Sequence, residues 1–317
     1  MTDTTTSSRR RYHAASRASA SRALRVRARD VRITGWLFVL PALAAYGLFV
    51  LWPLIETFKY SLYSWDGVAP ARWVGLDNFR SVFSDSELVG ALEHAFQLII
   101  YFSGIPVVLG LVVATVMRRV ASRRISSAAR VVLFLPQVVP LVAAGIAWSW
   151  VLSSSGVVNQ LLRAIGLGRV TRAWLGDFGT SLPAVGVIGA WVLLGLCTVL
   201  LLTGMSKIDP ALYEAAQLDG AGPVREFWSI TLPGLRQEIG VCVTVTVIAA
   251  LSAFDIVYIS TRGGPGDSTM VPGLKIYQLA FFNREVGVAS ALAVVLMALV
   301  LVCILPIQWW TRRGVES

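Results

Sequence analysis

The sequence has little charge for its length. Only 15% of its 317 residues are Asp, Glu, Lys or Arg, and 56% are hydrophobic, whereas a soluble globular protein carries about 25% charge. So few charges cannot cover a soluble surface, and the apolar residues come in long continuous runs. These features exclude an ordinary soluble domain and indicate an integral membrane protein.

Cysteine and histidine are scarce as well. The three cysteines, Cys197, Cys242 and Cys303, each lie inside an apolar run, where a cysteine behaves as a small hydrophobic residue. There is no CxxC pattern, and the two histidines, His13 and His94, lie far apart in the sequence. The sequence therefore gives no disulfide framework, no zinc site and no histidine-based catalytic triad.

Nucleotide-binding and catalytic motifs are also missing. The phosphate-binding pattern GxxxxGK[ST] does not occur, and no paired catalytic groups can be recognised inside the apolar runs. We therefore expect that the chain is not an enzyme and binds no cofactor itself. Its net charge of +10 is spread unevenly, which bears on membrane orientation, and we expect no nucleic-acid partner.

Six apolar runs are long enough to cross about 30 Å of hydrocarbon as helices. Each contains Gly or Pro, which membrane helices tolerate because kinks and close packing can be accommodated there. The predicted fold class is an all-α polytopic membrane protein with six transmembrane helices. The predicted spans are 33–55, 95–117, 131–152, 182–205, 239–260 and 286–310.

Basic residues set the predicted orientation. Residues 1–32 hold nine arginines and predict a disordered cytoplasmic tail close to anionic membrane lipid; a twin-arginine export signal is the alternative. With the N-terminus inside, 19 of the 28 Lys and Arg residues fall on the cytoplasmic side and nine fall outside. This asymmetry and the even number of spans place both termini in the cytoplasm, including a short tail at 311–317.

Three longer loops are expected outside. Residues 56–94 carry Trp and Phe side chains among polar residues, so this loop is expected to lie along the membrane interface. Residues 156–168 place their apolar side chains on one face, which predicts a short amphipathic helix on the outer surface. Residues 261–285 begin with a tight turn rich in Gly and Pro.

A polar segment, residues 206–237, separates the fourth and fifth apolar runs. Asp209 can cap a helix whose first residue is Pro210, where the missing N–H costs nothing. Gly220 can end that helix, because glycine adopts the left-handed conformation found at helix C-termini. The segment therefore predicts a capped cytoplasmic helix followed by a second one.

The second helix of this segment is expected to start after Gly222-Pro223 and to end at Leu232-Pro233. It would place Val224, Phe227, Trp228 and Thr231 near one face. Large apolar groups such as Phe227 and Trp228 remain exposed to the cytoplasm unless a partner covers them. The segment therefore indicates a docking element, and the alternative is an ordinary loop packed under its own bundle.

The spacing within the segment resembles a known motif. Glu214-Ala215-Ala216 is followed by Gly220 and, after nine further residues, by Ile230-Thr231-Leu232-Pro233. This pattern resembles the EAA motif of ABC importer permeases. The stretch Asp219-Gly220-Ala221 resembles the extension shown by sugar-type members of that family.

Other stretches carry the same resemblance, which covers about residues 33–310. It implies the type I importer permease (MetI-like) fold, a place in the bacterial plasma membrane, and a likeness to carbohydrate-uptake permeases of the maltose or glycerol-3-phosphate type. The supporting stretches are residues 75–79, the set Trp148, Gly156, Asn159 and Leu162, and the set 263–266, Thr269, Tyr277, Phe281, Gly287 and 289–291.

The resemblance also implies partners. A second homologous permease subunit would complete the pathway, two copies of an ABC ATPase subunit would bind ATP and Mg²⁺, and an extracytoplasmic binding protein would deliver the solute. Glu214 would lie near a basic residue of the ATPase, where it either transmits the ATPase motion or helps to dock it. The residues assigned to ATPase coupling are Glu214, Ala215, Ala216, Asp219, Gly220, Ala221, Phe227, Trp228, Ile230, Leu232 and Pro233.

Polar and aromatic residues inside the predicted spans are candidates for the substrate pathway. Asp255 is the only acid well inside a predicted span, which suggests function, although it could instead lie at the outer end, either paired with Arg262 or solvated. Trp148 could belong to an interfacial aromatic belt, and Trp191 could stack on a sugar ring or simply pack. The candidates are Gln137, Trp148, Trp191, Thr246, Asp255 and Tyr258.

The predicted function is a permease subunit of an ATP-driven ABC importer that moves a sugar or related solute by alternating access. The alternative is an ion-coupled transporter or channel without an ATPase, which predicts several intramembrane acids or inverted repeats. The predicted spans are nearly uncharged and no repeat is detectable. A membrane-embedded enzyme would need paired catalytic groups within the spans, and none is visible.

Overall fold

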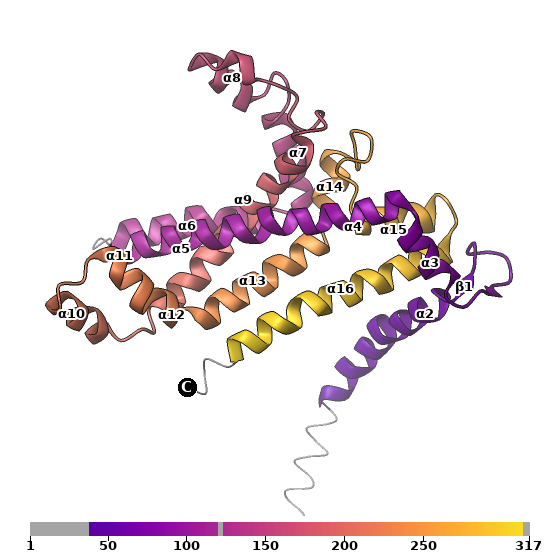
Figure 1. Cartoon of the computed structure of the whole chain (residues 1–317), viewed down its shortest axis with the longest axis horizontal. Helices are drawn as coiled ribbons and strands as arrows, with labels where there is room; N and C mark the ends of the chain where they lie inside the picture. Colours follow the sequence, from indigo (N-terminus) through magenta and orange to yellow (C-terminus); the bar gives the residue numbers. More distant parts are fainter. Residues whose placement is uncertain (1–37, 120–122, 313–317) are drawn as a thin grey trace, which may run out of the picture. The chain divides into compact units, whose positions relative to one another are not determined.

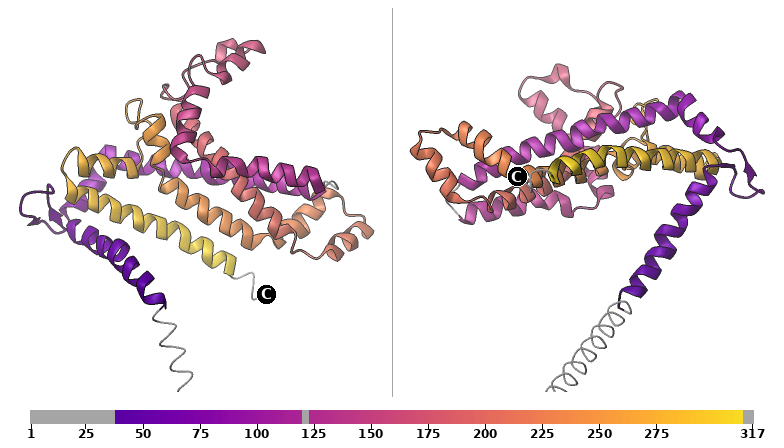
Figure 2. Two further views of the ribbon diagram at one scale, coloured as in Figure 1. Left: turned by 180° about the vertical axis from the view of Figure 1, so that it is seen from behind. Right: turned by 60° about the horizontal axis from the view of Figure 1, so that its bottom comes forward.

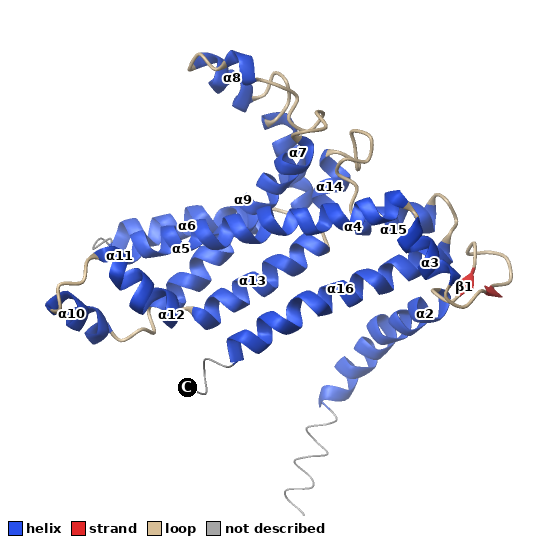
Figure 3. Ribbon diagram, in the orientation of Figure 1, coloured by secondary structure: helices blue, strands red, loops and turns tan. Residues whose placement is uncertain are grey.

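The computed structural model describes residues 38–119 and 123–312 (Figure 1). The described part is helical apart from loops and one small antiparallel hairpin, β1 (Tyr63–Ser64) and β2 (Arg72–Trp73) (Figure 3). The chain divides into two compact units, residues 1–57 and 58–317, which we treat separately. The predicted tail 1–32 and residues 313–317 lie outside the described residues.

The first unit is described from residue 38 onwards. An apolar helix extends from Phe38 to Tyr60, with a π-helical turn, η1 (Gly47–Leu51), before α2 (Trp52–Tyr60). The helix is long and apolar enough to cross a membrane. It extends several residues beyond the predicted end of the first span at 55, because no helix-breaking residue follows Pro53 before Tyr60.

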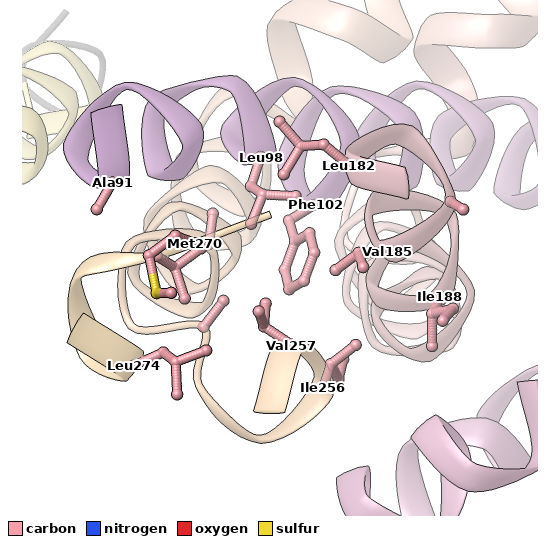
Figure 4. Packing of buried hydrophobic residues seen from close by; sticks show 14 of the residues in the cluster. Ala91, Leu98, Phe102, Leu182, Val185, Ile188, Ile256, Val257, Met270 and Leu274 are labelled. Carbon is pink, nitrogen blue, oxygen red and sulfur yellow. The ribbon is translucent and has the colours of Figure 1, made fainter. Parts of the chain in front are cut away.

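The second unit is built around two long helices. Helix α4 (Ser86–Ile99), η2 (Ile100–Gly104) and α5 (Ile105–Arg119) follow one another without a break, and α9 (Ser181–Met205) packs along η2 and α5. Phe102 lies in the middle of the main apolar cluster, among Leu98, Val185 and Val257 (Figure 4). A Cβ on Gly189 would overlap the Phe102 ring, so close approach requires glycine there.

Further helices complete this unit. Helix α13 (Arg236–Leu251) packs against α16 (Val286–Arg312) and α4. Two shorter helices, α3 (Asp77–Ser84) and α15 (Pro272–Phe281), pack against α16. The predicted amphipathic helix is present as α8 (Val157–Ala164), which follows α7 and precedes the short η3 (Gly168–Val170).

Two of the predicted spans are interrupted. The third span, predicted as 131–152, consists of α6 (Arg123–Val138) and α7 (Leu141–Val151), which meet at 99°. Pro140 has extended backbone angles and no N–H to donate, so it ends the helix. The fifth span, predicted as 239–260, ends at Leu251 and resumes after residues 252–254 as α14 (Asp255–Ser260). Each of these two predicted spans therefore consists of two helices in the structure.

The described helices bear on the predicted number of spans. Four of them are individually long and apolar enough to cross a membrane, and the number rises to six if each of two bent pairs is counted as one span. The bent pairs are Ser127–Val138 with Leu141–Val151, and Pro223–Gly234 with Arg236–Leu251. The chain is a multi-pass helical membrane protein.

Segments distant in the sequence meet at the two ends of the second unit. Helix α10 (Pro210–Leu218) and α11 (Pro223–Glu226) lie at one end, close to the end of α5 (Figures 1 and 2), and the start of α13 nearby contacts the C-terminal end of α16. There Arg236 Nη2 donates a hydrogen bond to the Trp310 carbonyl oxygen at 2.6 Å. The hairpin, α3 and α15 gather at the other end. This arrangement separates residues 206–237 from the loop 261–285.

Candidate functional site

The first helix of segment 206–237 forms as its sequence predicts. The Asp209 carboxylate accepts a hydrogen bond from the Ala211 N–H at 2.9 Å, and Pro210 is the first residue of α10. At the other end, Gly220 has a φ of +76°, which strongly favours glycine. These local interactions fix both ends of the helix, so the prediction for α10 is confirmed.

The second helix differs from the prediction. After α11 the chain forms a π-helical turn, η4 (Phe227–Thr231), and continues through α12 (Leu232–Gly234), so the helix ends one residue after the predicted Leu232-Pro233. A π turn adds one residue per turn and shifts the side chains that follow. As a result Trp228 is 64% exposed whereas Thr231 is buried. The expected single face carrying both residues was therefore wrong.

The inner side of the segment is held by specific contacts. Tyr213 is buried, and its hydroxyl lies 3.1 Å from the Thr231 hydroxyl. The guanidinium carbon of Arg118, from the end of α5, lies 3.4 Å from the centroid of the Tyr213 ring. Gln217 Nε2 donates a hydrogen bond to Glu226 Oε1 at 3.1 Å. These contacts join α10 to η4 and to α5, around a cavity of about 450 Å³.

Sequence reasoning missed Tyr213 and Arg118. The only local signal was a tyrosine beside Glu214 within an otherwise small and polar helix. Its partner Arg118 lies 95 positions earlier and was interpreted only as an orienting charge. A cation–π contact between them could not be read from the sequence, because it depends on how α10 packs on α5.

The outer side of the segment is open. Leu218 is 89% exposed and Val224 is 71% exposed, which is unusual for apolar side chains. Small residues lie between them along the chain, so a partner surface can approach closely. Among the predicted coupling residues, the exposed ones are Glu214, Ala215, Asp219, Gly220, Trp228 and Pro233, and the half-buried ones are Ala216, Ala221, Phe227, Ile230 and Leu232.

A second candidate site lies inside the bundle. A cavity of about 540 Å³ is bounded by residues 137–141 at the break of the third span and by residues 252–256 at the break of the fifth. Residues of α9, among them Gly189 and Val192, complete its wall. The two interruptions therefore line one cavity, which we call the intramembrane cavity.

Two predicted pathway residues line the intramembrane cavity. Gln137 Oε1 is buried and accepts no hydrogen bond within the described residues. Asp255 is exposed and begins α14, immediately after the break, which agrees with the alternative of a solvated carboxylate. No ion pair joins it to Arg262 in the described part of the chain. Sequence reasoning missed Ser252 and Phe254, which also line the cavity.

The other pathway candidates lie elsewhere. Thr246 is fully buried, and its hydroxyl lies 2.8 Å from the Ser103 hydroxyl, so it joins α13 to η2 and does not line the cavity. Trp148 and Trp191 pack edge to face with ring centroids 5.6 Å apart. Tyr258 stacks on Phe254 at 5.3 Å and lines a separate, smaller cavity.

The fold and these sites define a class of protein. A multi-pass helical bundle surrounds a cavity at two interrupted helices, and an exposed two-helix platform lies at one end. These are the features of a membrane transport subunit rather than of an enzyme.

Comparison with known proteins identifies the family. Residues 106–313 match the family described as binding-protein-dependent transport system inner membrane component. The chain belongs to this family and is the permease subunit of an ABC importer. Membership of this family supports the predicted ABC importer and not the alternative of an ion-coupled transporter or channel.

Individual relatives agree over most of the chain. The probable ABC transporter permease protein YurN of Bacillus subtilis is 34% identical over 90% of this chain and 98% of its own length. The diacetylchitobiose uptake system permease protein NgcF of Streptomyces coelicolor is 34% identical over 86% of this chain and 80% of its own length. The crystal structure of a bacterial ABC transporter that imports the acidic polysaccharide alginate contains a similar chain, with a TM-score of 0.76, 25% identity, and coverage of 90% of this chain and 98% of that one.

Proposed function

We propose that this subunit imports a saccharide or a related polyol across the bacterial plasma membrane. It would act with a second permease subunit, two ATPase subunits that bind ATP and Mg²⁺, and an extracytoplasmic solute-binding protein. The chain would cross the membrane six times, with both termini and residues 206–237 in the cytoplasm. Saccharide transport is supported by relatives named for uptake of diacetylchitobiose and of sulfoquinovosyl glycerol.

The platform formed by α10 to α12 is the proposed docking site for an ATPase subunit. The observation that carries this proposal is its two-sided construction. The inner side is fixed to α5 through Arg118 and Tyr213, whereas the outer side exposes Leu218, Val224 and Trp228. A platform that is rigid on one side and apolar on the other can pass the motion of a bound partner to the bundle.

The intramembrane cavity is the proposed solute site. Helix ends leave up to four N–H and four C=O groups without intrahelical partners, and the breaks between α6 and α7 and between α13 and α14 bring such ends to one cavity. Non-helical backbone within a membrane protein is tolerated where it lines a cavity. Together with Gln137 and Asp255, these groups can hydrogen-bond to a solute rich in hydroxyl groups.

Purification of this chain with its native partners tests the proposal. An ATPase subunit should copurify, and the assembled transporter in proteoliposomes should take up a saccharide when ATP is present. N,N′-diacetylchitobiose, maltose and cellobiose are suitable first probes. Glu214→Ala should lower ATP-driven uptake by about tenfold or more if the carboxylate forms a charge-assisted contact with the ATPase, without reducing the amount of chain in the membrane.

Glu93→Ala, at an exposed carboxylate outside the platform, serves as the matched control and should transport at the wild-type rate. Normal uptake by the Glu214→Ala transporter would show that Glu214 does not contribute to ATPase docking. Uptake driven by an ion gradient through the chain alone, with no ATPase subunit attached, would overturn the proposed function.

A further inference from the structure

A second polar and aromatic cavity lies beside the intramembrane cavity. It has a volume of about 370 Å³ and lies between α14, the turn after it, and α15. We call it the α14–α15 cavity. Its walls are formed by Tyr258, Arg262, Leu274, Tyr277, Gln278, Phe282 and Asn283.

The rings in its wall form a corner. Tyr258 and Tyr277 are nearly perpendicular, with an interplanar angle of 80° and ring centroids 5.8 Å apart. Phe282 lies next to Tyr277, with ring centroids 5.5 Å apart. The C–H faces of a sugar ring pack favourably on aromatic side chains of this kind, which are apolar in the middle and polar at one end.

The polar groups of the cavity lack protein partners among the described residues. In the described part of the chain, the side chains of Arg262, Gln278 and Asn283 and the two tyrosine hydroxyls make no hydrogen bond or ion pair. A guanidinium and two amides supply both donors and acceptors, which is the mixture that vicinal hydroxyl groups require. The cavity therefore offers aromatic surface and unused hydrogen-bonding groups in one place.

The backbone holds Arg262 in an unusual conformation. Its φ is +53°, in the left-handed region that non-glycine residues seldom adopt. The turn around it is fixed, because its N–H bonds to the Val257 carbonyl oxygen at 2.9 Å and the hydroxyls of Thr261 and Thr269 lie 2.7 Å apart. Backbone strain that is maintained by surrounding hydrogen bonds is often found at functional sites.

The walls of the two cavities are in contact through one pair of rings. Phe254 lines the intramembrane cavity and stacks on Tyr258, which lines the α14–α15 cavity, with ring centroids 5.3 Å apart and planes within 10°. Helix α14 begins with Asp255 at the first cavity and leads to the turn that carries Arg262 at the second. One stacked pair of rings therefore separates the two cavities.

We propose that the α14–α15 cavity is a second saccharide-binding site, which holds one pyranose ring on the extracytoplasmic side before the solute enters the intramembrane cavity. The proposal rests on the saccharide substrate and the orientation proposed above. The volume is near the lower limit of small-molecule pockets, about 300–1,000 Å³, and suits a single ring rather than an oligosaccharide.

Saturation-transfer NMR tests this proposal directly. The transporter is placed in lipid nanodiscs without its binding protein, and its aromatic protons are irradiated in the presence of N,N′-diacetylchitobiose or cellobiose. The C–H protons of one sugar unit should receive saturation. Arg262→Gln and Asn283→Ala should each reduce this signal by about threefold or more, since each removes hydrogen bonds to the sugar.

A matched control is available in the same region. Arg284 is also an arginine with a positive φ, +58°, but it does not line the cavity. Arg284→Gln should leave the saturation signal unchanged. Gln137→Ala, in the intramembrane cavity, should leave the part of the signal that Arg262→Gln removes. Tyr277→Leu gives a second test, since it removes one aromatic ring from the wall of the cavity and should also reduce the signal. Tyr277 packs partly on the core, so the thermal stability of this variant is measured separately.

Two results would overturn the second site. One is a saturation signal that Arg262→Gln and Asn283→Ala leave intact but Gln137→Ala abolishes. The other is the absence of any signal with a saccharide that the wild-type transporter takes up, which would leave the proposed function standing. An Arg262-dependent signal from a saccharide that is not transported would instead support the site and count against the proposed substrate.

Discussion

Tyr213 is the residue through which the exposed platform is attached to the bundle. Its ring lies under the Arg118 guanidinium and its hydroxyl lies beside Thr231, so one side chain contacts both α5 and η4. A cation–π contact contributes about 0.5–2 kcal/mol, depending on its burial. The segment is therefore expected to move together with α5 when a partner pulls on it.

Replacement of Tyr213 separates attachment from docking. Tyr213→Leu removes the ring from under Arg118 and the hydroxyl from Thr231, so we expect uptake per ATP hydrolysed to fall by about fivefold or more. Tyr213→Phe keeps the ring and loses one hydrogen bond, so its ratio should stay within about twofold of wild type. Uptake and ATP hydrolysis are measured on the same proteoliposomes. An unchanged ratio in Tyr213→Leu would show that the contact does not transmit motion.

The structural roles of some residues could be predicted from their neighbours in the sequence, and those of others could not. Asp209, Pro210 and Gly220 act on their own chain neighbours, so the ends of α10 could be read from the sequence. Thr246 could not be placed, because its partner Ser103 is 143 positions away and only the packing of α13 on η2 shows that it is buried.

At the scale of elements, close packing of α9 on α6 depends on a single glycine. A Cβ at position 195 would overlap the carbonyl oxygen of Leu133, a backbone atom that cannot move unless α6 moves. Overpacking of this kind usually lowers the free energy of unfolding by about 1–3 kcal/mol. Leu133 lies four residues before Gln137, so a shift of α6 would also change the intramembrane cavity.

Gly195→Ala should therefore lower both the stability and the transport rate. We expect the midpoint of thermal unfolding in detergent to fall by several degrees, since about 1 kcal/mol corresponds to about 2–4 °C in a chain of this size. Gly104→Ala is the control, because a Cβ there meets no atom within 4 Å. Equal midpoints for the two variants would contradict the packing of α6 on α9 described here.

The sequence predicted the long helices better than their interruptions. Continuous apolar composition identifies α9 and α16, which agree closely with the predicted spans 182–205 and 286–310. Residues 252–254 are Ser, Ala and Phe, and none of them is a helix breaker. The break there is set by tertiary packing around the cavity, and a local pattern cannot report it.

At the scale of the whole molecule, residues 206–237 lie at one end of the second unit and the hairpin, α3 and α15 lie at the other, and the two sets are predicted for opposite sides of the membrane. Single cysteines test the proposed sidedness. Val68→Cys and Leu218→Cys place thiols at positions that are 84% and 89% exposed. Cys197 and Cys242 are buried, so only Cys303 needs replacement to remove the background.

A membrane-impermeant maleimide should label Val68→Cys in intact cells. It should label Leu218→Cys only after the membrane has been opened, because the platform lies in the cytoplasm in the proposed topology. Labelling of both positions from outside would require a different number of spans between them.

The two interrupted spans also bear on how such a transporter can evolve. Amide and carbonyl groups at helix ends are present with any side chain except that of proline, so most point mutations leave them at the cavity. A pore that recognises its cargo largely through the main chain accepts many polyols to a similar extent. A lineage can then acquire a new nutrient by exchanging the protein that delivers it, while this subunit stays almost unchanged.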